Sequence, residues 1–202
     1  MIDLSDPADP AQVNTLPTPR STRVGDVKAT RVETDFFQGD LLVVSNEDCR
    51  FRGARGIELW DVTDLPNAEF LGSLGPKQAS STTFFEGGFG VHNLYLYQKG
   101  DRAFALLAAS GAETDQANND LPATGEFKIV EVTNPREPVQ IASWGVKQDL
   151  GEPVGRILSN GTVRGDDCRP VCRGEEGAWI YLHDVWPTGT GRSPISRIGT
   201  RA

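Results

Sequence analysis

Short hydrophobic runs separated by polar turns dominate the chain from about residue 28 onward. The first strand candidate is "ATRVETDFF", which the turn "QGD" separates from the continuous apolar run "LLVVS". The segments "GIELWDVT" and "AEFLGSLG" follow, with the break "DLPN" between them. Apolar runs of this length bounded by turn residues are typical of β-strands, and no helical period competes with them. Residues 28–78 are therefore predicted to form four strands joined by short turns.

The first unit has a near copy further along the chain. Residues 60–75 align without a gap with residues 130–145, beginning with "WDVT" against "VEVT". A repeat of four strands forms one twisted sheet, which cannot bury both of its faces alone. Sheets of this kind pack radially around an axis as propeller blades. We therefore expect the units at about 28–78 and 91–148 to be neighbouring blades.

A third unit, at about 156–202, is incomplete. The segment "RILSNGTVRG" predicts a hairpin, and "WIYLHDVWP" restates the opening "VHNLYLY" of the second unit, but the closing "SPISRIGTRA" has no strand alternation. Residues 1–25 are rich in Pro, Asp, Thr and Ser and predict a flexible lead-in. The predicted fold is all-β: a partial β-propeller over residues 26–202, with about two and a half four-stranded blades.

These motifs are similar to a known repeat. The pairing of "GIELWDVTDLPNAEFLGSLG" with "GEFKIVEVTNPREPVQIASWG" resembles the LVIVD repeat of bacterial and archaeal β-propeller proteins, in which a strand like "LxIVDVS" precedes "DPxxPxxxG". The segments "VHNLYLY", "LHDVWP" and "LLVVSNEDC" also resemble that family, so the resemblance covers roughly residues 28–190. Leu65-Pro66 replaces the usual Asp-Pro, and the third copy lacks its ending. The resemblance implies a secreted or cell-surface protein that acts in binding or scaffolding rather than as an enzyme.

An incomplete propeller leaves sheet edges exposed. Propellers with fewer than about four blades are not expected to close. Open edges invite pairing with another chain. We expect the sequence to be a fragment of a longer propeller, and a partial propeller that self-associates through its open blade edges is the alternative.

Charge and hydropathy argue against two classes of partner. The chain of 202 residues carries a net charge of -8, whereas nucleic-acid binding needs a basic face. No apolar run approaches the about 20 residues that a membrane-spanning helix needs. We therefore expect no nucleic-acid partner and no membrane span, and the ligand or protein partner is unknown. The N-terminus lacks the pattern of a secretory signal, which alone indicates a cytoplasmic protein, so the extracellular and cytoplasmic locations both stay open.

The two histidines occupy the same place in their units. His92 precedes Asn93, and His183 precedes Asp184. If both imidazoles face one propeller axis, they form a site for a divalent transition metal. Asp184 is then either a metal ligand or a hydrogen-bond acceptor that orients a ligating histidine. This arrangement resembles the propeller enzymes related to selenium-binding protein, which use channel histidines for copper, and it implies a metal-dependent oxidoreductase as the competing function. The alternative is that each histidine only fixes the packing of neighbouring blades.

Two further sets of residues are candidates for a role in the function. The segment "SNEDC" follows a buried strand, where propeller loops bind ligands, so Asn46, Glu47 and Asp48 are predicted to form a binding loop. Asp61 and Glu131 precede equivalent Val-Thr turns. An acid/base pair or calcium ligands are conceivable there, but we expect these carboxylates to accept hydrogen bonds from the turns.

The three cysteines leave two interpretations open. Cys49, Cys168 and Cys172 make an odd count, and "CRPVC" lacks the spacing of a zinc knuckle or a thioredoxin-type redox pair. One disulfide within the set is expected if the protein is exported. Three free thiols are the alternative.

Overall fold

The computed structural model describes nine parts of the chain. They are residues 1–48, 56–75, 90–109, 127–145, 149, 155–157, 163–164, 178–187 and 194–201. Every regular element named in them is a strand, apart from the short 3-10 turn η1 (Leu65–Asn67). The prediction of an all-β chain with four-stranded antiparallel sheets is confirmed.

The first sheet contains β3 (Thr22–Glu33), β4 (Gln38–Asp48), β5 (Gly56–Asp61) and β6 (Glu69–Leu74). Its spatial order is β3-β4-β5-β6, and each strand runs antiparallel to the next. Consecutive strands are therefore neighbours throughout, as short polar turns between apolar runs require.

The second sheet repeats this arrangement. It contains β7 (Asn93–Lys99), β8 (Arg102–Ala108), β9 (Phe127–Glu131) and β10 (Val139–Trp144), again with consecutive strands antiparallel and adjacent. The two segments that align in the sequence thus form equivalent strands: β5 corresponds to β9, and β6 to β10.

Even an irregularity of the pairing is repeated. Between β5 and β6 the register shifts next to Leu59 and Trp60, with Leu71 as the extra residue. Between β9 and β10 it shifts at the equivalent place, with Ile141 as the extra residue. Such a bulge bends a strand and increases its twist. The ungapped alignment of the sequence is therefore a structural repeat at the level of individual residue pairs.

The third sheet differs from the first two. It contains β11 (Gly155–Ile157), β12 (Val163–Arg164), β13 (Ala178–Pro187) and β14 (Pro194–Arg201), in the order β12-β11-β13-β14. The predicted hairpin is present as the antiparallel pair β11 and β12. The closing segment, in which no strand was expected, pairs along the whole of β14 with β13. A ladder offered by a neighbouring strand outweighs the weak local pattern of this segment.

The first 25 residues contain more structure than their composition predicts. β1 (Ile2–Asp3) and β2 (Ala11–Gln12) form a small two-stranded sheet of their own. β3 already begins at Thr22, within the segment that was expected to be a lead-in.

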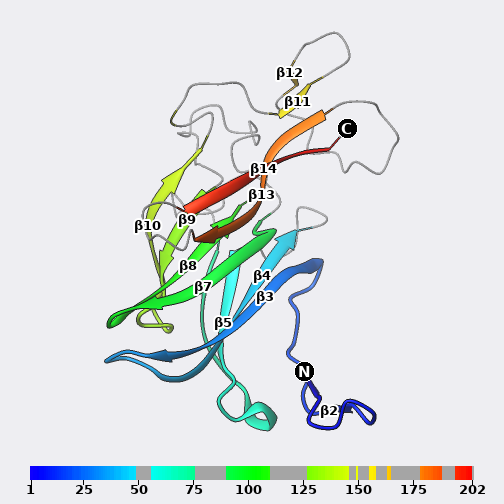
Figure 1. The fold of residues 1–202 in the computed structure, drawn as a ribbon, viewed down its shortest axis with the longest axis vertical. Helices are drawn as coiled ribbons and strands as arrows, with labels where there is room; N and C mark the ends of the chain where they lie inside the picture. The colour runs from blue at the N-terminus through cyan, green and yellow to red at the C-terminus, as the bar shows by residue number, and fades with distance from the viewer. Residues whose placement is uncertain are drawn as a thin grey trace.

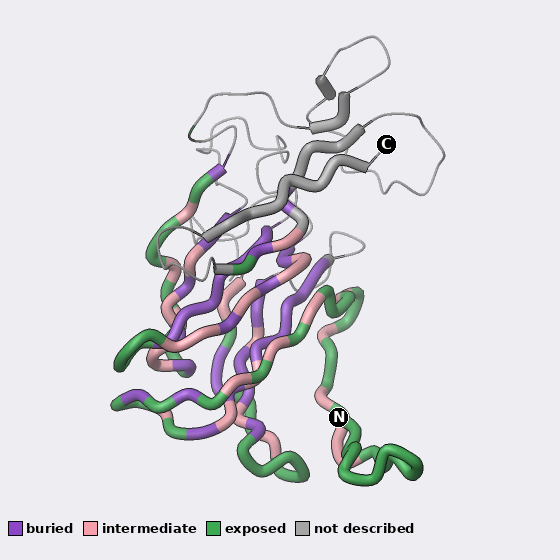
Figure 2. The backbone as a smooth tube through the Cα atoms, viewed as in Figure 1, coloured by how far each residue is buried: buried purple, intermediate pink, exposed green. Residues whose placement is uncertain are grey.

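The sheets are stacked, and each has two different faces. We call the forward face the one that carries Ile57 and Leu59 in the first sheet and the equivalent Phe127 and Ile129 in the second. The rear face is the opposite one. The main core lies between the forward face of the first sheet and the rear face of the second (Figures 1 and 2). Its buried residues are Val32, Leu41, Val43, Ile57, Leu59, Leu71, Val91, Leu94, Leu96, Ala103, Ala105, Leu107, Ala109, Val130 and Val132.

Two smaller cores lie on the outer sides of this pair of sheets. The forward face of the second sheet packs on β13; the buried residues there are Leu106, Ala108, Phe127, Leu182 and Val185. The rear face of the first sheet is covered by the N-terminal segment; the buried residues there are Val44, Trp60 and Val62. The described chain is therefore a stack of four layers: N-terminal segment, first sheet, second sheet and β13.

We expect Gly72→Ala to destabilise the stack of the first two sheets. A Cβ at Gly72 would stand 2.6 Å from the carbonyl oxygen of Pro135 and 3.1 Å from that of Arg136, in the turn after β9. Backbone has to move to relieve such a clash, at a cost of about 1–3 kcal/mol in the free energy of unfolding, measured by urea denaturation. Ala142 is the equivalent position in β10 and is exposed. The control Ala142→Val should therefore change stability by less than about 0.5 kcal/mol, and equal effects of the two substitutions would contradict the packing of this turn on β6.

Candidate functional site

The end of β4 meets the start of β7 at a close approach of two backbones. Glu47 forms an isolated antiparallel bridge with Gly90, and the Val91 N–H donates to the carbonyl oxygen of Asn46 at 3.1 Å. Gly90 has a φ of 109°, and a Cβ there would lie 2.2 Å from the same Asn46 oxygen. Only glycine accommodates both this φ and this approach. The junction therefore places the polar ends of the first and second sheets against each other.

Glu47 contacts an imidazole and a guanidinium group at this junction. Its side chain is buried, and the residue is only 4% exposed. One carboxylate oxygen lies 2.6 Å from Nδ1 of His92, and the other accepts from Nε of Arg23 at 2.8 Å and also from a terminal guanidinium nitrogen. Burial alone would raise the pKa of Glu47, but the hydrogen bonds and charges of His92 and Arg23 outweigh it and lower the pKa from its usual value. Glu47 is therefore held as a carboxylate between the two sheets.

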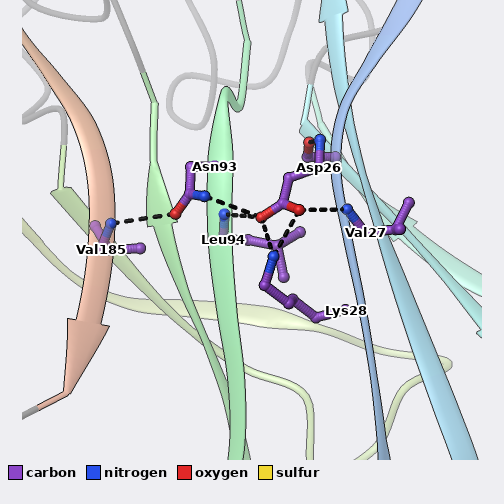
Figure 3. A network of polar contacts seen from close by, with 7 residues as sticks. Asp26, Val27, Lys28, Asn93, Leu94 and Val185 are labelled. Carbon is purple, nitrogen blue, oxygen red and sulfur yellow. Dashed lines mark hydrogen bonds and ion pairs between the residues drawn. The ribbon is translucent and has the colours of Figure 1, made fainter.

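A second polar network lies beside the first and connects the three four-stranded sheets (Figure 3). One oxygen of the Asp26 carboxylate accepts from Nδ2 of Asn93 at 3.0 Å and from the Leu94 N–H at 3.2 Å. The other accepts from the ammonium group of Lys28 at 2.6 Å. The side-chain oxygen of Asn93 in turn accepts from the Val185 N–H of β13 at 3.2 Å. Asp26 and Asn93 thus link β3, β7 and β13 in sequence.

An irregularity of β3 allows Asp26 to reach β7. The pairing of β3 with β4 shifts between Val24 and Val27, and the hydroxyl of Ser45 accepts from the Asp26 N–H at 2.7 Å. Beside this bulge, a Cβ on Gly25 would stand 2.6 Å from the carbonyl oxygen of His92. The missing side chain at Gly25 therefore lets β3 lie directly against the segment that leads into β7.

The predicted binding loop is not a loop in this structure. Asn46, Glu47 and Asp48 continue β4 and pair with β3, opposite Val24, Arg23 and Thr22, respectively. The sequence predicted that the strand now seen as β4 ends before Asn46, because β3, its partner, was expected to begin several residues later than Thr22. With β3 present from Thr22 onward, β4 has a partner along its whole length. Asn46 and Glu47 are consequently buried instead of exposed to ligands.

The predicted metal ligands are only partly described. His92 lies just before β7 with its Nδ1 bonded to Glu47, and the Asp184 side chain is partly buried in β13. The side chain of His183 falls outside the described residues. The bond from Val185 to Asn93 does bring the two repeated motifs side by side. Within the described part of the chain, no group of three or more His, Cys, Asp or Glu residues could hold a metal ion.

Glu47 and Arg23 are the site residues that the sequence did not connect with His92. Glu47 was expected in a ligand-binding loop, and Arg23 lay in the supposed lead-in. A local signal was weak: Val24 and Val27 are β-branched, but they stand three positions apart on either side of the bulge in β3, so no strand alternation marks this segment. The cysteines Cys49, Cys168 and Cys172 lie outside the described residues, so neither interpretation of them is tested.

The carboxylates before the two Val-Thr turns have a structural role, as expected. The Thr63 N–H donates to Asp61 at 2.9 Å, and the Thr133 hydroxyl donates to Glu131 at 2.8 Å. Arg102 also donates to both oxygens of Glu131, at 2.8 and 2.6 Å. The Arg102 hydrogen bonds, with a smaller effect of Thr133, lower the pKa of Glu131 to about 2. A carboxyl with this pKa is a poor proton donor or acceptor near neutral pH.

Comparison with known proteins gives no family assignment. No protein-family model matches the chain, and no curated protein matches it. None of the described residues forms a helix of the length and hydropathy that crossing a membrane requires.

We expect Glu47→Gln to lower the free energy of unfolding by about 1–2 kcal/mol at pH 7, because the charge-assisted hydrogen bonds to a buried carboxylate are lost. The loss is no larger because the Arg23 side chain is largely exposed and solvent screens its charge. Glu33 forms an exposed ion pair with Arg31 and provides the control. Glu33→Gln should change the free energy of unfolding by less than about 0.5 kcal/mol. Urea denaturation measures both.

The pH dependence gives a second test of the same variant. The folded-state pKa of Glu47 lies below its ordinary value of 4.5. Its contribution to stability is therefore present above pH 4.5 and is lost as the pH falls through the lower folded-state pKa. The difference between wild type and Glu47→Gln should shrink on acidification, and a difference that grows would contradict this assignment.

Proposed function

We propose that this chain is a β-propeller-type protein that acts in binding or scaffolding. The observation that carries the proposal is the repeated stacking: two sheets with the same strand order and the same bulge lie forward face to rear face. Radial stacking of such four-stranded units is the architecture of propeller blades. The LVIVD-like motifs, which fall on equivalent strands of the two sheets, support the same interpretation.

The positions of the leading strands also support a propeller arrangement. β3 lies beside β7, and β7 lies beside β13 (Figure 1). In a propeller, the first strand of each blade lies nearest the shared axis, so the leading strands of successive blades are neighbours. The first two sheets supply two blades under this proposal. The third sheet supplies a further, modified unit, because its hairpin of β11 and β12 lies on the other side of β13 from β14.

The junction of the sheets favours a structural and recognition role over catalysis. The carboxylates of Glu47 and Asp26 are each bonded to groups from a neighbouring sheet, which fixes how the sheets meet. A general acid or base works best with a pKa near the operating pH. The neighbours of Glu47 shift its pKa away from neutrality. Ligand recognition by loops on this rigid frame is the function that such an arrangement supports best.

We place the protein at the cell surface or outside the cell under this proposal, on the resemblance to LVIVD-repeat proteins. Protease treatment of intact cells that express the gene natively should remove the protein while cytoplasmic markers survive. Full protection of the protein in intact cells, with digestion after lysis, would contradict an external location.

One observation favours the alternative of a metal-dependent oxidoreductase. Metal-ligating histidines commonly bond a carboxylate through their second ring nitrogen, which orients the imidazole. His92 has such a partner in Glu47, at 2.6 Å from Nδ1. His183 stands in β13 two positions before Val185, whose N–H bonds the residue after His92. Imidazoles of this kind suit divalent transition metals.

Metal content separates the two functions. The purified full chain is incubated in turn with Cu²⁺, Zn²⁺ and Fe²⁺, dialysed, and measured by mass spectrometry together with His92→Ala and His183→Ala. For a binding protein we expect far less than one equivalent of metal, unchanged in either variant, while His92→Ala lowers stability through loss of the Glu47 contact. About one equivalent of metal that both variants lose would favour the oxidoreductase.

A further inference from the structure

A half-buried carboxyl group lies on the rear face of the first sheet. Glu58 in β5 is paired with Val44 on one side and with Ser73 on the other, two residues before Trp60. No ion pair among the described residues includes Glu58. Burial raises the pKa of Glu58, and the nearby indole N–H of Trp60 and amide of Asn46 lower it only in part. The ionised form of Glu58 is therefore left without a compensating positive charge on the described part of this face.

Two buried polar atoms beside Glu58 are also unsatisfied. Asn46 is 2% exposed and Trp60 is 8% exposed. Within the described part of the chain, neither Oδ1 of Asn46 nor Nε1 of Trp60 forms a hydrogen bond of normal length and angle. Nearly all buried polar atoms of native proteins have a partner. Because Asn46 and Trp60 both lie beside Glu58, the three side chains form one incompletely satisfied polar cluster.

The row of the sheet that contains Glu58 is open to solvent, although the N-terminal segment packs beside it. Residues paired across antiparallel strands share a face, and the pairing places Val27 and Ser73 in this row on the rear face. Val27 is 49% exposed, and Ser73 is exposed too. Phe70, which lies edge-on to Trp60 at 5.2 Å, is 46% exposed. A ligand can therefore approach Glu58 with the N-terminal segment in place.

The equivalent place in the second sheet is closed. Lys128 is the counterpart of Glu58 in the aligned repeat, two residues before Val130. It is fully buried, on the rear face that packs against the first sheet. The repeat thus has a charged residue at this position in both sheets, but only the first sheet presents it where solvent reaches the row.

The chemistry of the cluster indicates a cation with an apolar body. An ammonium group on Glu58 neutralises the carboxylate and supplies the donor that Oδ1 of Asn46 lacks. A hydrocarbon chain attached to it can lie on the exposed side chains of Val27 and Phe70. A stable protein interface needs about 20 residues on each side, far more than this row offers, so the ligand is a small molecule.

We propose that Glu58 anchors a binding site for a small primary alkylammonium ion on the rear face of the first sheet. Glu58 binds the ammonium group, Asn46 accepts a second hydrogen bond from it, and the indole N–H of Trp60 donates to the ionised carboxylate. Val27 and Phe70 contact the alkyl chain. The site depends on contacts of the first sheet alone, so it can fail or hold independently of the propeller-type function proposed above.

Titration of the purified full chain with a model amine tests the site. Hexylammonium chloride is added at pH 7 in an isothermal titration calorimeter, and hexan-1-ol is titrated in parallel. We expect a dissociation constant of about 0.1–1 mM for hexylammonium. Hexan-1-ol has the same chain without the charge, so it should bind at least about tenfold more weakly.

Removal of the carboxylate should abolish this preference. Glu58→Gln should weaken hexylammonium binding by at least about tenfold. The exposed carboxylate of Glu33 in β3 provides the control, since Glu33→Gln changes the net charge equally and should leave the affinity unchanged. Burial disfavours the charge of Glu58 in the folded chain, so Glu58→Gln should not lower the urea midpoint. Lost binding with unchanged stability separates a ligand-binding role from a structural one.

A lysine built into the chain provides a second test. Ser73→Lys places an ammonium group opposite Glu58 on the neighbouring strand, where opposite charges attract. This lysine should occupy the site and weaken hexylammonium binding by at least about tenfold. Ser73→Gln is the matched control and should bind hexylammonium as the wild type does. Both substitutions fall at an exposed position, which the fold should tolerate.

Three results would overturn the proposal. In the first, the wild type binds hexylammonium no more tightly than hexan-1-ol. In the second, hexylammonium binds equally well to the wild type, Glu58→Gln and Ser73→Lys. In the third, Glu33→Gln weakens binding as much as Glu58→Gln does, which would show that the amine responds to the net charge of the chain instead of to this site.

Discussion

Stacking of apolar sheet faces is the interaction on which the rest of this structure depends. The first and second sheets each carry hydrophobic residues on both faces, and a four-stranded sheet of this kind cannot be stable with either face in water. The fifteen-residue core between them buries one face of each. The remaining two faces are covered by β13 and by the N-terminal segment. Each layer therefore owes its stability to its neighbours.

Polar contacts at one end of the strands define how the layers meet. Glu47 and Asp26 are bonded across the gap between the first two sheets, and Asn93 carries the connection on to β13. Two glycines, Gly25 and Gly90, make the approach possible because a Cβ at either would collide with the opposing backbone. Apolar packing alone tolerates sliding, whereas satisfied buried polar groups select one arrangement. The junction is thus a specificity element of the stack.

This architecture bears on how the protein works. Under the proposed function, the carboxylates at the junction hold the sheets together, and the loops and faces of the stack recognise the ligand. The repeat also explains the N-terminal segment, which closes one end of the stack in place of a sheet. The same stacking therefore leaves the rear face of the first sheet under the N-terminal segment.

The sequence by itself determined most of the strands and their repetition, because these follow from local alternation and from an ungapped match. Trp60 and Val130 do occupy equivalent strands. The hydroxyls of Thr63 and Thr133 accept equivalent hydrogen bonds, from the Asp40 N–H and the Ala103 N–H. Only the tertiary structure decided which residues meet across layers. The pairing of Glu47 with His92, the extension of β4, the strand β14 and the covering position of residues 1–16 all depend on partners far away in the chain. Local periodicity carries no information about such partners, since a residue's burial and pairing are set by whichever layer comes to lie against it.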